Sequence, residues 1–164
     1  MAGSSRRHTP AEPQDAQTFL AALDSYAAAV RRARGARPRA TGDWLTLSQY
    51  GLLEPLARQP EARIRELADA AGITASTATR ILDALERRGI VRRTRSATDR
   101  RAVAVTLTPQ GRRLFETQHA WVRERERALY EGLPPRERAI AARVLGGLTE
   151  LIDELAAGPP DNPA

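Results

Sequence analysis

Apolar residues recur three or four positions apart from Asp15 to about Arg34, and this spacing predicts an amphipathic helix. Its apolar stripe consists of Phe19, Leu20, Leu23, Tyr26, Ala27 and Val30. Gly and Pro in residues 35–43 interrupt the period and predict a linker. A second helix is predicted in LTLSQYGLLEPLARQ, with Ser48 expected as its N-cap. Pro55 lies inside that pattern, so we expect it to kink the helix or loosen its last turn.

Residues 61–91 predict a short helix, a tight turn and a second helix. Gly72 suits the turn because glycine tolerates positive φ. Thr74 is expected to cap the second helix and Gly89 to end it. The inward faces are assigned to Ile64, Leu67, Ala68 and Ala71 in the first helix and to Ala78, Ile81, Leu82 and Leu85 in the second. The opposite side of the second helix carries mainly Ser76, Thr77, Thr79, Arg80 and Arg87.

From Val91 the period changes to two, which indicates β-strands. The segments VRRTR and AVAVTL are predicted to pair as a hairpin joined by SATDRR. Thr108 is expected to cap a new helix that has Pro109 at its first position. Its stripe consists of Leu114, Phe115, Gln118, Trp121, Val122, Arg125 and Leu129. A last helix is predicted from about Pro135 to Leu155, with Ile140, Val144, Leu148, Leu151 and Leu155 on one side.

This order of elements predicts a mainly α fold with a small β-hairpin wing, that is, a winged helix-turn-helix between flanking helices. Composition further restricts the kind of core, the cysteine chemistry and the location expected for this protein. Aromatic residues make up only 4% of the 164 residues, so the core must be aliphatic and rich in Ala. Cysteine is absent, which excludes disulfides, thiolate zinc sites and thiol redox sensing. Residues 1–14 lack the apolar core of a signal peptide, and no run reaches the roughly 20 apolar residues of a membrane helix. We therefore expect a cytoplasmic protein with no membrane partner.

The positive charge is concentrated in the middle of the chain. The net charge is +6, and every basic side chain other than the two His is Arg. Residues 58–113 hold 13 Arg against 6 acidic residues, whereas the rest of the chain holds 13 Arg against 14 acidic residues. A basic centre between neutral helical flanks favours a module that binds a polyanion.

The residue types of the predicted helix-turn-helix suit double-stranded DNA. Short hydroxyl side chains near Thr74 allow the helix to enter a major groove, where Arg80 can bind guanine through a bidentate fork. Arg100 and Arg101 at the hairpin tip can reach a narrow minor groove, which concentrates negative potential. Asp99 beside them can hold a guanidinium in one orientation.

The run ITASTATRILDALERRGIVRR followed by DRRAVAVTLTPQG resembles the MarR (multiple-antibiotic-resistance regulator) family of winged-helix repressors. The matching features are the Ser-Thr-x-Thr-Arg run, the helix end LERRGIV, the Asp-x-Arg wing and the Leu-Thr-x-x-Gly exit. They cover residues 63–111 closely, while the flanking helices match in length and order. Pro55 is not part of the family's usual pattern.

The resemblance implies a homodimeric regulator that binds a pseudo-palindromic operator and is released by a small anionic or phenolic ligand. The implied DNA contacts are Ser76, Thr77, Thr79, Arg80, Arg100 and Arg101, with Asp99 orienting Arg101 as the minor-groove finger and Arg100 contacting the DNA backbone. Trp44, Tyr50, Phe115 and His119 are candidates to line a ligand cleft. Together with the composition of the two ends, the resemblance predicts a disordered tail at 1–14, a dimerisation helix and linker at 15–46, the DNA-binding domain at 47–111, dimerisation helices at 112–156 and a disordered tail at 157–164.

Simpler interpretations of the same residues remain open. Arg101 can be a solvated loop charge, and Ser76, Thr77 and Thr79 can simply be a helix start rich in capping residues. His119 is expected to be a packing or surface residue, and Trp44 and Trp121 to fill a core or dimer interface more readily than a ligand site. The different class of function left open is a winged-helix protein–protein assembly module. The sequence offers no Gly-rich phosphate loop, no metal-spaced His or Cys cluster and no nucleophile with a base, so no enzyme, cofactor or metal is expected.

Overall fold

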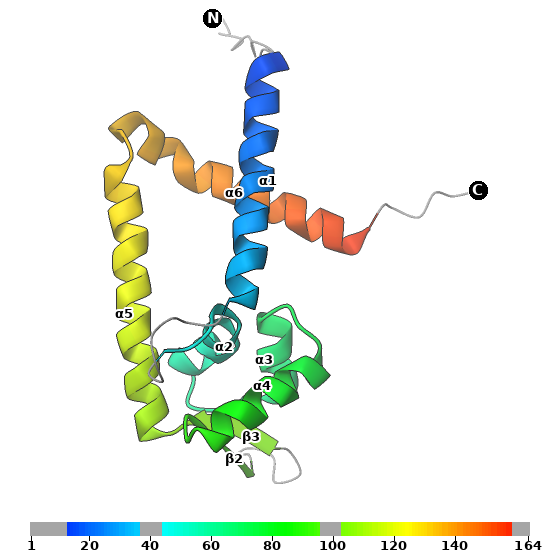
Figure 1. The fold of residues 1–164 in the computed structure, drawn as a ribbon, viewed down its shortest axis with the longest axis vertical. Coiled ribbons are helices and arrows are strands. Elements are labelled where there is room, and N and C mark those ends of the chain that lie inside the picture. Colours follow the sequence, from blue (N-terminus) through cyan, green and yellow to red (C-terminus); the bar gives the residue numbers. More distant parts are fainter. Residues whose placement is uncertain (1–12, 37–43, 96–102, 159–164) are drawn as a thin grey trace, which may run out of the picture. The chain divides into compact units, whose positions relative to one another are not determined.

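The computed structural model describes residues 13–36, 44–95 and 103–158 (Figure 1). The chain divides into two compact units after Glu116. The first unit holds α1 (Pro13–Gly35), α2 (Leu47–Leu53), the 3-10 helix η1 (Glu54–Ala57), β1 (Ala62–Arg63), α3 (Ile64–Ala70), α4 (Ala75–Arg87), β2 (Val91–Arg95), β3 (Val103–Leu107) and the start of α5 (Pro109–Gly132). The second holds the rest of α5 and α6 (Pro135–Ala157). The predicted fold, mainly helical with a small antiparallel sheet, is confirmed.

The sheet has one strand more than the predicted hairpin. Its order is β1-β3-β2, because Ala62 pairs with Val105 and Arg63 with Ala104 on the open side of β3. On the other side β2 pairs antiparallel with β3, from Val91 opposite Leu107 to Arg95 opposite Val103. A strand of two residues is too short to show a period of two, so β1 becomes visible only through its partner.

The start of α2 corrects one predicted cap. Ser48 lies within the helix, and Thr46 is the N-cap. Thr46 Oγ1 accepts a hydrogen bond from Gln49 N at 3.2 Å, and Thr46 N donates to Gln49 Oε1 at 3.0 Å. This reciprocal pair is a capping box, which satisfies two backbone donors at once. Ser48 Oγ donates instead to the carbonyl oxygen of Arg34, at 3.3 Å, at the end of α1.

The disruption of the helix predicted at Pro55 is present, but the last turn tightens instead of loosening. The α-helix ends at Leu53, and the chain continues as η1 with Pro55 near its start. Proline lacks the N–H that would continue the α-helical ladder, so the last turn tightens into a 3-10 helix. Both predicted turn glycines are also confirmed, since Gly72 and Gly89 have φ of 62° and 70°.

The core of the first unit is aliphatic with a few aromatic residues. It is built mainly from Leu45, Leu52, Leu53, Leu56, Leu67, Leu82, Leu85, Ile90, Val105 and Phe115. The helix α3 packs on both α2 and α4, and α4 packs on β2. Burying the apolar side of α4 against this core leaves its polar side facing outward.

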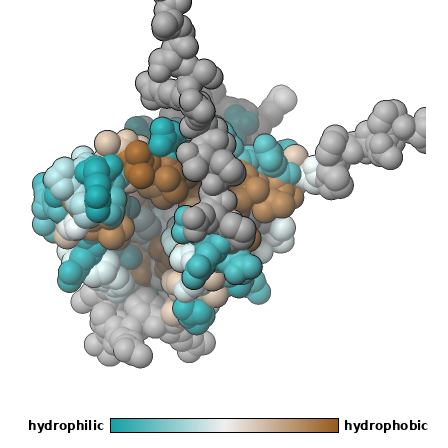
Figure 2. Space-filling model, turned by 90° about the horizontal axis from the view of Figure 1, so that it is seen from above, coloured by the Kyte–Doolittle hydropathy of each residue, from teal (hydrophilic) through white to brown (hydrophobic). Residues whose placement is uncertain are grey.

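Apolar side chains on α1 and α6 remain exposed. None of the residues of α6 is buried, and its predicted stripe residues Ile140, Val144, Leu151 and Leu155 are exposed. On α1 the exposed residues include Phe19, Leu20 and Tyr26. Figure 2 shows apolar side chains, coloured brown, at the surface of the molecule. Within the described ranges, no helix combines the length and apolar character needed to cross a membrane.

Candidate nucleic-acid interface

The N-terminal end of α4 is a cluster of hydroxyl groups organised around Thr74. Thr74 is the N-cap, and its Oγ1 accepts a hydrogen bond from Thr77 N at 3.2 Å. The same oxygen lies 3.0 Å from Ser76 Oγ and 2.9 Å from Thr77 Oγ1. The prediction of Thr74 as the cap is confirmed. The hydroxyls of Ser76 and Thr77 contact the capping residue at the N-terminal end of the helix. They also lie beside the backbone N–H groups of this end, which attract phosphate.

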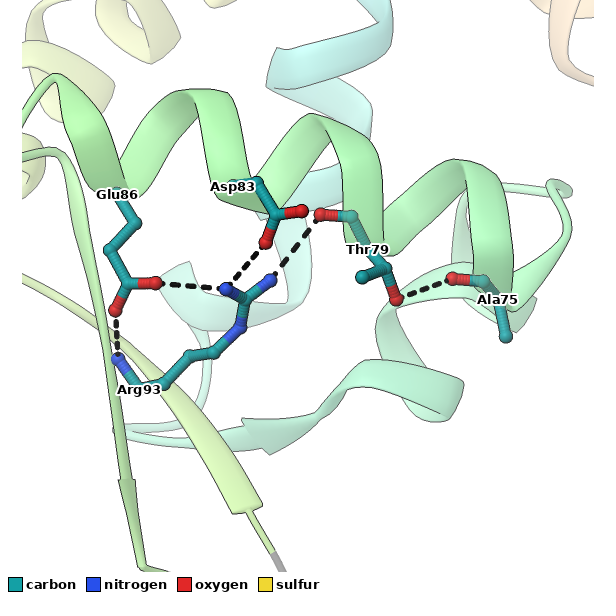
Figure 3. A network of polar contacts seen from close by, with 5 residues as sticks. All are labelled: Ala75, Thr79, Asp83, Glu86 and Arg93. Carbon is teal, nitrogen blue, oxygen red and sulfur yellow. Dashed lines mark hydrogen bonds and ion pairs between the residues drawn. The ribbon is translucent and has the colours of Figure 1, made fainter.

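The outward face of α4 is polar and short. Ser76, Thr79 and Arg80 are exposed, Thr77 is half-buried, and Ala78 and Leu82 on the other side are fully buried. Thr79 Oγ1 donates to the Ala75 carbonyl oxygen at 2.9 Å, which leaves its own lone pairs available as acceptors (Figure 3). The structure therefore brings all four predicted α4 residues together on one end of one helix.

The predicted wing-tip residues Asp99, Arg100 and Arg101 lie outside the described residues. The two strands that lead to them are described, and β2 is attached to α4 by Arg93 (Figure 3). Arg93 Nη1 lies 2.6 Å from Asp83 Oδ1 and 2.8 Å from Glu86 Oε2. Arg93 Nη2 donates to the Thr79 carbonyl oxygen at 3.3 Å, and Arg93 N donates to Glu86 Oε1 at 3.0 Å.

Arg93 is not among the residues predicted for the site, although the strand pattern contains a signal for it. Alternation places Arg93 on the same side of β2 as the buried Val91. An arginine directed toward a core requires acidic or carbonyl partners. Asp83 and Glu86, three residues apart on the preceding helix, are suitable partners in the sequence.

The four candidate ligand residues have different surroundings. The rings of Tyr50 and Phe115 are stacked, with centroids 5.2 Å apart and planes 8° apart. Phe115 is fully buried and Tyr50 nearly so. The stacked ring of Phe115 therefore holds the ring of Tyr50 in place. Trp44 is half-buried, and His119 is half-buried in the second unit.

Tyr50 also lines a hollow of about 310 Å³ within the first unit. The wall from α1 consists of Tyr26, Val30 and Arg34, and the remaining lining residues are Leu47, Ser48, Gly51, Glu54, Ala71 and Ile73. One guanidinium and one carboxylate therefore face a space walled by aromatic and aliphatic groups. Among the residues that the structure describes, no group of three or more His, Cys, Asp or Glu side chains could hold a metal ion.

Comparison with known proteins assigns the family. The model of the MarR family matches residues 45–103, which run from the approach to α2 to the first residue of β3. The homoprotocatechuate degradative operon repressor of Escherichia coli is 30% identical over 139 residues, covering 82% of this chain and 89% of the repressor. This chain belongs to the MarR family. The resemblance seen in the sequence is thus confirmed.

Solved structures of DNA-binding proteins share this fold. One is BpsR of Bordetella bronchiseptica, from work on the mechanism by which 6-hydroxynicotinic acid regulates its DNA binding. BpsR is 25% identical to this chain with a TM-score of 0.58, and the match covers 83% of this chain and 98% of BpsR. The transcriptional repressor CouR, bound to a 23-mer DNA duplex, is 33% identical with a TM-score of 0.56, covering 65% of this chain and 76% of CouR. Because the family and these relatives are transcription regulators, this MarR-family chain is a regulator and not an enzyme.

Proposed function

We propose that this MarR-family regulator binds double-stranded DNA sequence-specifically as a homodimer, represses transcription, and leaves its operator when a small anionic or phenolic ligand binds. The observation that carries the proposal is the outward end of α4, where hydroxyl groups and Arg80 are exposed while the opposite side is buried. Such a face fits a major groove without steric conflict. The DNA complex of the related repressor CouR supports the same use here.

The proposed roles follow from residue chemistry. Ser76, Thr77 and Thr79 bind phosphates or base edges through their hydroxyls, and Arg80 binds guanine through two parallel hydrogen bonds. In the wing, Arg101 enters the minor groove with Asp99 holding its guanidinium, and Arg100 binds the DNA backbone. The Arg excess of residues 58–113 supplies attraction that does not depend on sequence.

The proposed homodimer accounts for the exposed apolar surface. Soluble chains rarely leave large apolar stretches open to water, because burying them releases about 25 cal/mol per Å². Ile140, Val144 and Leu151 on α6, together with Phe19 and Leu20 on α1, are therefore the residues proposed to meet a second copy. Two copies would present two α4 helices to one pseudo-palindromic operator. Separately, we infer that the regulator acts in the cytoplasm.

The proposed ligand site is the hollow walled by Tyr26, Arg34, Tyr50 and Glu54. Arg34 can pair with a carboxylate or phenolate, while the tyrosine rings contact an aromatic ring. Regulation of BpsR by 6-hydroxynicotinic acid, an aromatic acid, supports this class of ligand. We keep Trp44, Phe115 and His119 as further candidates, with Phe115 acting through the ring of Tyr50.

The DNA-binding proposal is tested by selecting bound sites from random duplexes and then titrating the consensus at several salt concentrations. We expect a two-fold symmetric consensus and a log Kd that rises by about 0.9 per log unit of salt for each phosphate neutralised. Salt-independent binding, or no enrichment over random DNA, would instead favour a protein–protein assembly module. The ligand site is tested with 6-hydroxynicotinate and a panel of aromatic acids, for which Arg34→Ala should weaken binding and leave operator affinity intact.

A further inference from the structure

Arg93 makes several polar contacts with one helix. Its guanidinium lies between Asp83 and Glu86, at 2.6 and 2.8 Å, and its Nη2 binds the Thr79 carbonyl oxygen at 3.3 Å. Its backbone N–H also donates to Glu86. The side chain is 23% exposed, against 43% for Asp83 and 39% for Glu86. Three residues of α4 are thereby attached to a single residue of β2 (Figure 3).

The charges show that Arg93 is not a free cation. One guanidinium faces two carboxylates, so the cluster carries a net charge of −1 if all three groups are ionised. Nε of Arg93 is buried and forms no hydrogen bond within the described part of the chain. A phosphate approaching Arg93 would meet two acidic side chains that already hold it. DNA contact is therefore an unsuitable role for this residue.

The position of the cluster suits a structural task next to the DNA. One anchoring point, the Thr79 carbonyl, belongs to the helical turn that carries Thr79 and Arg80. The strand that holds Arg93 ends at Arg95, and the residues predicted for the wing tip follow it in the sequence. Major-groove and minor-groove contacts act together only if α4 and the wing keep a fixed relative placement, to within about 0.5 Å and 10–20° for a precise site.

From this arrangement we infer that Arg93 is a positioning residue, which fixes β2 and its wing to α4 through Asp83, Glu86 and the Thr79 carbonyl. The inference rests on the proposed DNA-binding function. It makes operator affinity depend on two acidic residues, against the electrostatic expectation that acidic groups near DNA weaken binding. Loss of those carboxylates raises the positive charge of the surface and yet lowers sequence-specific affinity.

The experiment compares four proteins with the wild type: Arg93→Ala, Arg93→Lys, the double variant Asp83→Asn/Glu86→Gln, and Arg92→Ala as a matched control. Arg92 is the exposed neighbour on the same strand, so its loss removes one charge without touching the cluster. Kd is measured for the selected operator and for a scrambled duplex at several salt concentrations. Thermal melting verifies that each protein is folded.

We expect Arg93→Ala and the double variant to lose roughly 10-fold in operator affinity, equivalent to about 1.4 kcal/mol. The scrambled duplex and the salt slope should change little, and Arg93→Lys should recover part of the loss because it keeps one ion pair. Arg92→Ala should affect both duplexes alike.

Tighter operator binding by the double variant, together with weaker binding by Arg93→Ala to both duplexes, would identify Arg93 as a phosphate contact and overturn the inference. Equal operator affinity of all variants and the wild type would also overturn it while leaving the proposed function intact. A folded wild-type protein that binds no duplex would refute the proposed function itself, and the inference with it.

Discussion

Gly111 lies against Ile90 so closely that a Cβ atom at position 111 would stand 1.9 Å from the Ile90 carbonyl oxygen. The contact joins the first turn of α5 to the residue that leads into β2. Thr108 reinforces it, because Thr108 N donates to that same carbonyl at 3.0 Å and Thr108 Oγ1 accepts from Gly111 N at 3.0 Å. The C-terminal end of α4, the sheet and the start of α5 therefore meet at one close backbone contact.

Replacing Gly111 with Ala should destabilise the protein. The added methyl would press on a backbone oxygen, and overpacking of this kind costs about 1–3 kcal/mol. Gly51→Ala is the matched control, since Gly51 lies in α2 with nothing within 4 Å of its added Cβ. That control should be neutral or stabilising by up to about 1 kcal/mol, because Ala is the better helix former. Urea unfolding of both variants measures the difference, and equal midpoints would contradict the steric argument.

Arg80→Ala should weaken operator binding by about 1–3 kcal/mol and relax the preference for one base pair. Arg80 is exposed at the open end of α4, so its removal should leave the melting temperature unchanged. Arg87→Ala removes the same charge from the other end of the same helix and is the control. Fluorescence anisotropy with operator duplexes substituted one base pair at a time measures both effects. An equal loss of affinity for all substituted duplexes would indicate that Arg80 contacts phosphates and not a base pair.

Arg101→Ala should also weaken operator binding by about 1–3 kcal/mol without changing the oligomeric state of the protein. Asp99→Ala should show part of the same loss, because Asp99 is proposed to act only through Arg101. A double variant should then be no weaker than Arg101→Ala alone, the non-additivity expected of residues in one interaction. Additive losses of binding free energy in the same titration would show that Asp99 and Arg101 act independently.

Val144→Glu should shift the protein from dimer to monomer. Val144 is an exposed apolar residue of α6, and a carboxylate buried without a partner at an interface is strongly unfavourable. Arg143→Glu introduces the same side chain at the neighbouring exposed position and serves as the comparison. Sedimentation velocity at micromolar concentration should show a dimeric wild type and a largely monomeric Val144→Glu protein. A monomeric wild type would remove the dimer from the proposed function.

Much of the fold follows from local pattern, because it depends on interactions within a few residues. Helical periods, the change to a period of two at Val91, and the turn glycines at 72 and 89 all correspond to observed elements. Thr74 and Thr108 cap their helices as predicted, since an N-cap needs only a hydroxyl near the N–H of a residue three positions later. The exposed α4 residues also follow from local pattern, because the other side of the same helix is apolar.

Tertiary structure decided what depends on a distant partner. The strand β1 exists only because β3 offers an unpaired edge at Val105. Gly111 is required by a backbone oxygen that lies 21 positions earlier in the chain. Arg93, one of several arginines in the sequence, is set apart by two carboxylates and a carbonyl that the α4–β2 packing places around it. Sequence alone therefore determined which helix faces the proposed DNA, whereas the packed structure determined which residue holds that helix to the wing, because only packing brings fixed charges from separate elements within ion-pair distance.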